Sequence, residues 1–120
     1  MKSISMGEIE SRFAELIWEN APLTSSALVQ LAAKELNWKK STTHTVLKRL
    51  SEKGLFLNDG GTIRVQITKD EYGVQLGEEL IEREFCGSLP AFLAAFSKRR
   101  TLTEEELAEL RSLLEQSGKE

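Results

Sequence analysis

The sequence has few of the residues that catalytic and metal sites need. Its 120 residues include one histidine, His44, and one cysteine, Cys86. A single cysteine excludes an intramolecular disulfide, and these two side chains are too few for a zinc site. The sequence also lacks a nucleophile–base pair and a glycine-rich phosphate loop. We therefore expect a protein that is not an enzyme and that binds no metal or cofactor.

Long apolar runs are missing as well. No stretch approaches the roughly 20 apolar residues that cross a bilayer. The first ten residues, MKSISMGEIE, lack the apolar segment of a secretory signal, so we expect a cytoplasmic protein without membrane insertion. Hydrophobic residues make up 40% and charged residues 29% of the chain, a balance typical of a globular protein rather than a disordered one.

The net charge of −3 argues against nucleic-acid binding, but the distribution of charge argues for it. Residues 1–70 hold ten Lys and Arg against eight Asp and Glu, whereas residues 71–120 hold six against eleven. Within the first part, residues 39–69 carry seven cations and two carboxylates, a net charge of +5. Such a basic block in an acidic chain is typical of a local polyanion-binding surface, although solvated helices also carry runs of this kind.

The hydrophobic pattern predicts three helices at the start of the chain, over residues 8–20, 24–36 and 41–54. Ala21-Pro22 ends the first helix, because proline supplies no N–H, and Gly54 ends the third. The apolar stripe of the first helix comprises Ile9, Phe13, Leu16 and Ile17.

A hairpin follows the third helix. Strands are predicted over residues 55–58 and 62–68, on either side of a turn at 59–61. The alternation of Ile63, Val65 and Ile67 with polar residues predicts one buried and one wet face. Three helices and a hairpin in this order indicate a winged helix-turn-helix domain over residues 1–70. The predicted fold class is therefore mainly α with a small β-hairpin.

Residues 71–120 are predicted to form a helical dimerisation domain. Helices are expected over 69–85, 88–96 and 101–116, with Ser88 and Thr103 as N-caps. Too few residues surround their apolar faces to bury them within one chain, so a second copy of the chain is expected to cover them. The predicted dimerisation residues are Phe85, Leu89, Phe92, Leu93, Phe96, Leu107, Leu110 and Leu114.

The third helix carries the functional prediction. At about 100° per residue, Thr43, Val46, Leu47 and Leu50 share one face, which must point to the core. The opposite side mixes short hydroxyls near the N-terminus with longer cations, a combination that suits a helix lying in the major groove of DNA. A surface helix with the same residues by chance is the competing interpretation. The predicted DNA-binding residues are Lys39, Lys40, Ser41, Thr42, Thr45, Lys48, Arg49 and Arg64.

The segment WKKSTTHTVLKRLSEKG (38–54) resembles the recognition-helix segment of the penicillinase-repressor family. The resemblance extends to ELIW (15–18), to the glycine of the wing turn and to CGSL (86–89), and covers almost the whole chain. Eight matches at fixed spacing form a specific signal, unlike a lone short motif. The matching positions of the segment are Trp38, Thr42, Thr45, Leu47, Arg49, Leu50, Lys53 and Gly54.

This resemblance implies a homodimeric winged-helix repressor of β-lactamase or other antibiotic-response genes. It implies a palindromic double-stranded operator with TACA/TGTA-like half-sites. It also implies inactivation by a membrane sensor-protease that cleaves in the dimerisation region, near Ala95-Phe96.

The chain departs from the family pattern at three places. Lys39 stands where the family often has serine, so the third helix must take its N-cap from Ser41 or do without one. Gln66-Ile67-Thr68 replaces the usual Tyr-Thr-Pro at the end of the wing. The cysteine cluster of the copper-sensing relatives is absent, which excludes copper sensing.

Two other functions stay open on the sequence. A winged-helix regulator relieved by a small ligand would need an open crevice lined by Phe85, Phe92 and Phe96. A winged-helix module that binds only proteins would show no salt-dependent DNA binding. Outside these surfaces, Trp18 and Trp38 are interpreted as packing residues and Cys86 as a small buried hydrophobe. His44 fits either a phosphate contact or a solvent-facing position.

Overall fold

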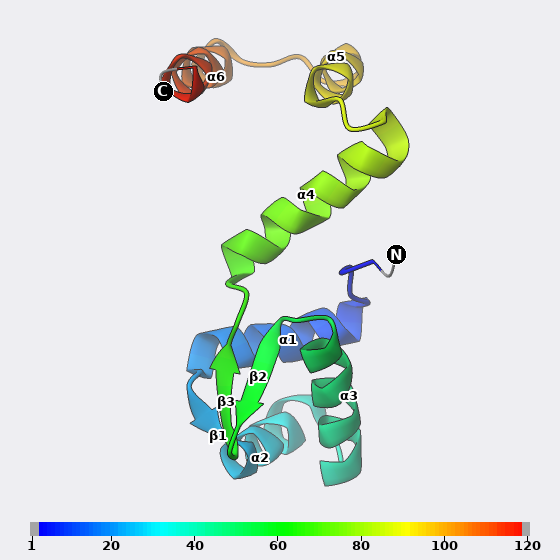
Figure 1. The fold of residues 1–120 in the computed structure, drawn as a ribbon, viewed down its shortest axis with the longest axis vertical. Coiled ribbons are helices and arrows are strands. Elements are labelled where there is room, and N and C mark those ends of the chain that lie inside the picture. Colours follow the sequence, from blue (N-terminus) through cyan, green and yellow to red (C-terminus); the bar gives the residue numbers. More distant parts are fainter. Residues whose placement is uncertain (1–2, 119–120) are drawn as a thin grey trace. The chain divides into compact units, whose positions relative to one another are not determined.

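A computed structural model describes residues 3–118, and Figure 1 shows their fold. The chain divides into two compact units between Glu79 and Leu80, inside helix α4, whereas the predicted division after residue 70 falls at the start of that helix. No helix among the described residues is long and apolar enough to cross a membrane. The elements are α1 (Glu8–Asn20), β1 (Leu23–Thr24), α2 (Ser25–Leu36), α3 (Lys40–Glu52), β2 (Phe56–Asp59), β3 (Thr62–Val65), α4 (Lys69–Phe85), α5 (Leu89–Arg99) and α6 (Glu104–Ser117).

The predicted fold class is confirmed: a winged helix-turn-helix unit is followed by further helices. In the N-terminal unit, the N-cap Thr24 begins α2 by accepting a 3.1 Å hydrogen bond from the Ala27 N–H, which is one of the unpaired donors of the first turn. Helix α1 buries Phe13, Ala14 and Ile17. The predicted stripe of α1 is wrong for Ile9, which is 58% exposed. Because the buried face is centred toward Ala14, Ile9 lies at its edge in the first turn.

The wing belongs to a three-stranded antiparallel sheet of order β1-β3-β2. β1, which the sequence did not predict, pairs with β3 so that Leu23 lies opposite Ile63. The turn of the β2–β3 hairpin consists of Gly60 and Gly61, whose φ angles of 59° and 94° are those that a two-residue type I′ turn requires. The Gly61 carbonyl accepts a 2.9 Å hydrogen bond from the N–H of Ser25, the first residue of α2, and so joins the wing turn to that helix (Figure 1).

The core of the N-terminal unit lies between the three helices and one face of the sheet. The prediction of a buried Val65 is wrong: it is 36% exposed at the end of β3, where it borders a shallow groove with Ala21 and Pro22. The fully or almost fully buried apolar residues are Ile4, Phe13, Ala14, Ile17, Leu28, Ala32, Val46, Leu47, Leu50, Leu55, Phe56, Ile63 and Tyr72.

Both tryptophans pack against this core, as predicted. The Trp18 indole N–H donates to the Ile67 carbonyl at 2.9 Å, and its ring lies 5.5 Å from that of Phe56. The Trp38 ring lies 4.9 Å from that of Phe13. Each ring therefore fixes a helix end or a strand end to the core rather than offering a free stacking surface.

The C-terminal unit consists of the end of α4, α5 and α6. Ser88 caps α5, and Thr103 and Glu106 form the predicted capping box of α6. The prediction of a buried Cys86 is wrong: it is exposed, with a φ of 50°, because it occupies the left-handed turn after α4 and not an apolar helix face. None of residues 80–118 is buried.

Candidate nucleic-acid interface

Helix α3 presents two faces of opposite character, and the predicted core face is confirmed. Thr43 is 1% exposed, and Val46, Leu47 and Leu50 are buried beside it. The N-cap Lys39 makes no side-chain capping bond. The Thr43 hydroxyl donates to the Lys39 carbonyl at 3.2 Å, so the polar group of this buried residue has a partner in the first turn of the helix. The side chains that remain exposed are Lys40, Ser41, Thr42, His44, Thr45, Lys48, Arg49 and Glu52.

Three short hydroxyl side chains cover the N-terminal half of the exposed face. The Thr45 hydroxyl donates to the Ser41 carbonyl at 2.9 Å, so its proton is engaged within the helix. Its oxygen still has a lone pair for a base amino group, and its methyl group is free to contact the methyl of thymine. The hydroxyls of Ser41 and Thr42 form no hydrogen bond to any of residues 3–118. The arrangement allows a close approach to base edges.

Three lysines supply unpaired positive charge on and beside this face. Lys39, Lys40 and Lys48 are exposed and form no ion pair or side-chain hydrogen bond within the described part of the chain. On the wing, the Arg64 guanidinium lies 3.2 Å from the Asp59 carboxylate, and both side chains are more than half exposed. Such a surface pair is worth at most about 1 kcal/mol, so a phosphate can replace the carboxylate.

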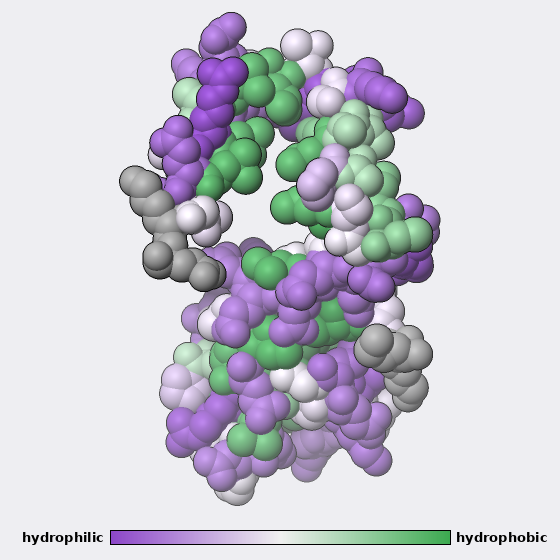
Figure 2. Space-filling model, turned by 45° about the horizontal axis from the view of Figure 1, so that its top comes forward, coloured by the Kyte–Doolittle hydropathy of each residue, from purple (hydrophilic) through white to green (hydrophobic). Residues whose placement is uncertain are grey.

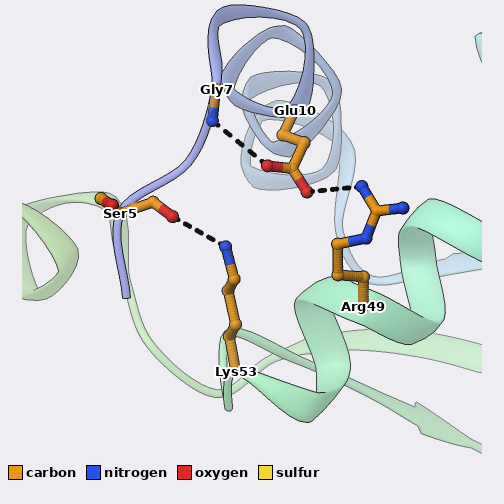
Figure 3. Close-up of polar contacts among 5 residues, drawn as sticks. All are labelled: Ser5, Gly7, Glu10, Arg49 and Lys53. Atoms are coloured by element: carbon orange, nitrogen blue, oxygen red, sulfur yellow. Dashed lines mark hydrogen bonds and ion pairs between the residues drawn. The ribbon is translucent and has the colours of Figure 1, made fainter. Parts of the chain in front are cut away.

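The other cations of the basic block have hydrogen-bond partners within the N-terminal unit. The Lys69 ammonium lies 2.7 Å from the Glu15 carboxylate, and the hydrogen bond to Glu15 raises the pKa of Lys69. The Lys53 ammonium donates to the Ser5 carbonyl at 2.7 Å. Arg49 donates to Glu10 at 3.1 Å, as Figure 3 shows. The sequence pattern of α3 therefore predicted the exposure of Arg49 but not its partner.

Glu10 has both of its oxygens engaged. One accepts from the Gly7 N–H at 3.2 Å and the other accepts from Arg49 (Figure 3). Burial raises the pKa of Glu10, but the hydrogen bonds from Gly7 and Arg49 and the charges of Lys53 and Arg49 outweigh it, so the pKa lies below its ordinary value. Glu10 is therefore ionised at neutral pH.

Shallow grooves on both sides of His44 contain polar residues that the sequence reasoning missed. The first, of about 400 Å³, is lined by Lys40 and His44 of α3 and by Ser25, Ser26, Val29 and Gln30 of α2. The second brings Asn58 of the wing next to His44, Lys48 and Ser51. The hydroxyl run at the start of α2 was the available signal for Ser25 and Ser26, whereas nothing local marks Gln30 or Asn58.

The C-terminal helices expose apolar side chains, visible as green surface at the top of Figure 2. The rings of Phe85 and Phe92 lie 5.4 Å apart and those of Phe92 and Phe96 lie 5.7 Å apart, so the three rings pack on one another. Of the predicted dimerisation residues, Leu89, Phe96 and Leu114 are 50%, 37% and 64% exposed. The other five, Phe85, Phe92, Leu93, Leu107 and Leu110, are partly buried.

The three-helix core, the wing and the exposed hydroxyl and lysine face of α3 define a winged helix-turn-helix protein of the DNA-binding class. The model of the penicillinase repressor family matches residues 6–116. The chain is also similar to the penicillinase repressor of Bacillus licheniformis, with 26% identity over 122 residues that cover 97% of this chain and 94% of that protein. The chain belongs to the penicillinase repressor family, as the recognition-helix segment predicted, and this is a family of transcriptional repressors rather than enzymes.

Proposed function

We propose that the protein is a cytoplasmic, homodimeric repressor that binds a palindromic operator and controls β-lactamase or other antibiotic-response genes. Two copies of α3 enter major grooves of the two half-sites. The observation that carries the proposal is the exposed face of α3, in a chain of net charge −3. On this face short hydroxyls lie among lysines that have no ionic partner within residues 3–118.

The proposed contacts divide by chemistry. Ser41, Thr42 and Thr45 approach base edges, where hydroxyl and methyl groups discriminate between bases. The cations contact phosphates, which give affinity without sequence information. The proposed phosphate contacts are Lys39, Lys40, Lys48 and Arg64. Arg49 is left out of this set because Glu10 engages its guanidinium.

Dimerisation is proposed to occur through the C-terminal helices. Residues such as Leu89 and Leu114 are at least half exposed, and none of residues 80–118 is buried in the single chain. Helices this short need a packing partner for their apolar face. A second copy supplies the same face by two-fold symmetry, which a palindromic operator matches.

Cleavage within α5 is the proposed means of ending repression. The Ala95-Phe96 bond lies inside α5, and both residues are exposed. The resemblance to the family implies a membrane sensor-protease as the enzyme that cuts it. Loss of the following helix α6 would remove part of the apolar surface on which the dimer depends.

The proposal is tested by selecting DNA from a genomic library with the purified full-length chain. We expect enrichment of inverted repeats whose half-site centres lie about 10–10.5 base pairs, or a multiple of this, apart. Four cations per protomer predict that log K falls with log salt concentration with a slope of about −7 for the dimer. Equal affinity for selected and random DNA, or a chain that sediments as a monomer at micromolar concentration, would overturn the proposal.

A further inference from the structure

The geometry points to Glu10 as a positioning residue for DNA recognition, which holds Arg49 of the recognition helix against α1 and so keeps that cation off the DNA. This inference rests on the proposed DNA-binding function. It assigns a role to a residue of α1, a helix outside the helix-turn-helix pair, and it changes the role expected for Arg49.

The two flanks of α3 face different neighbours. At about 100° per residue, Arg49 and Lys53 lie on one flank of the helix, while Lys40, His44 and Ser51 lie on the other. Arg49 and Lys53 bond to Glu10 and Ser5 of the N-terminal region. His44 and Ser51 border Asn58 of the wing. Arg49 therefore lies on the flank away from the wing, with a carboxylate already in place.

The contacts of Glu10 fix the carboxylate as well as its partner. The Glu10 side chain is 18% exposed, compared with 54% for Arg49. The Gly7 N–H holds one oxygen, so the other presents a fixed acceptor to the guanidinium (Figure 3). A partly desolvated carboxylate with two donors is harder to displace than the exposed Asp59 beside Arg64. A phosphate can therefore capture Arg64 more easily than Arg49.

The segment before α1 adds further contacts to the same end of α3 as the Glu10–Arg49 ion pair. Lys53 bonds to the Ser5 carbonyl at 2.7 Å, and the adjacent Ile4 is 9% exposed and belongs to the core. The Ile4 N–H donates to the Glu79 carboxylate at 2.7 Å, and the Ser3 hydroxyl donates to the same group at 2.9 Å. The C-terminal half of α3 is thus tied to a segment that is itself held at both the core and α4.

Two consequences separate a positioning role from a phosphate contact. If Arg49 touches no phosphate, Arg49→Gln leaves the slope of log K against log salt unchanged. If Glu10 keeps Arg49 away from the DNA, Glu10→Gln frees a guanidinium beside the DNA groove in which α3 lies. The freed cation then strengthens binding to random DNA and steepens the slope by up to about 0.9 for each new contact. Damage to the fold produces no such gain.

The experiment measures binding of full-length wild type, Arg49→Gln, Glu10→Gln and the double variant to random duplex DNA over a range of salt concentrations. Lys48→Gln is the matched control, because Lys48 is the adjacent residue, is exposed and has no ionic partner among residues 3–118. We expect the slope to fall by about 0.9 per lost contact for Lys48→Gln, to stay unchanged for Arg49→Gln and to rise for Glu10→Gln. The double variant should lose that rise.

The outcomes separate this inference from the proposed function. A slope that falls as much for Arg49→Gln as for Lys48→Gln overturns the role of Glu10 while leaving the repressor function intact. Wild-type protein without any salt-dependent DNA binding overturns the proposed function itself. If Glu10→Gln fails to fold in a thermal melt, the comparison of Arg49→Gln with Lys48→Gln decides the question alone.

Discussion

Replacement of Thr45 by alanine should weaken operator binding without weakening the fold. Thr45 is exposed on α3, and within the described part of the chain its hydroxyl bonds only to the Ser41 carbonyl of the same helix. Alanine is the better helix former by up to about 0.7 kcal/mol, so the melting temperature should stay the same or rise slightly. The lost base contact should cost about 1–3 kcal/mol for each half-site. A dimer with the substitution in both protomers should therefore lose about 2–6 kcal/mol, at least a roughly 30-fold loss of operator affinity.

A second substitution at the same position identifies the group that is read. Thr45→Val keeps the methyl group and the β-branched shape but removes the hydroxyl. If the methyl group contacts thymine, the valine variant should bind the operator like wild type. If the hydroxyl accepts from a base, the valine variant should bind as weakly as the alanine variant. Fluorescence anisotropy with operator and scrambled duplexes measures both.

Thr43 provides the contrasting control two residues earlier. It is 1% exposed, so Thr43→Asp places a carboxylate among Val46, Leu47 and Leu50. The cost of burying an unpaired charge is comparable with the 5–15 kcal/mol stability of a whole domain, and both specific and random binding should disappear with the fold. The reasoning about α3 is refuted if Thr45→Ala lowers both kinds of binding equally or melts like Thr43→Asp.

Three further predictions concern phosphate contacts, dimerisation and pH. Alanine at Lys40, Lys48 and Arg64 together should weaken binding to all sequences alike and reduce the salt slope by about 0.9 for each contact, whereas an unchanged slope would contradict their placement. A chain truncated after Glu79, which retains the core residue Tyr72, should sediment as a folded monomer with much weaker operator affinity; a dimer would show that the C-terminal helices are not the interface. Because the pKa of Glu10 is lowered, its contribution to stability is present above the ordinary value of 4.5 and disappears as the pH falls through the lower pKa of the folded state. Urea unfolding should therefore show Glu10→Gln to be less stable than wild type at pH 7 and equally stable below that folded-state pKa.

The elements of the fold could be predicted where periodicity runs over several turns or residues. Helix α3 shows four core positions in one pattern, and all four are buried. The two-residue strand β1 is too short to show any alternation, and only its pairing with β3 defines it. Val65 fits the alternation of β3 but is exposed at the end of the strand. A local pattern could not predict this, because it does not reveal where the core beneath a strand ends.

The site could be predicted in its residue types but not in its pairings. The angular positions on α3 follow from helix geometry, and the exposure of Thr42, Thr45 and Lys48 agrees with it. The partner of Arg49 lies 39 residues away, so no local pattern links the two. Cys86 is predicted to be buried because free cysteine generally behaves as a small hydrophobe, but it occupies the exposed left-handed turn after α4.

The attachment of the wing turn to α2 has a consequence for the entropy of DNA binding. Two contacts restrain the hairpin. β1 pairs with β3 along one edge, and the Ser25 N–H donates to the Gly61 carbonyl at the turn. Fixing a backbone residue costs about 1–2 kcal/mol of conformational entropy. For this wing the loss occurs when the domain folds and not when DNA arrives. In the proposed complex, Arg64 therefore meets the duplex at a set offset from α3, and DNA whose groove spacing differs must itself deform to reach both.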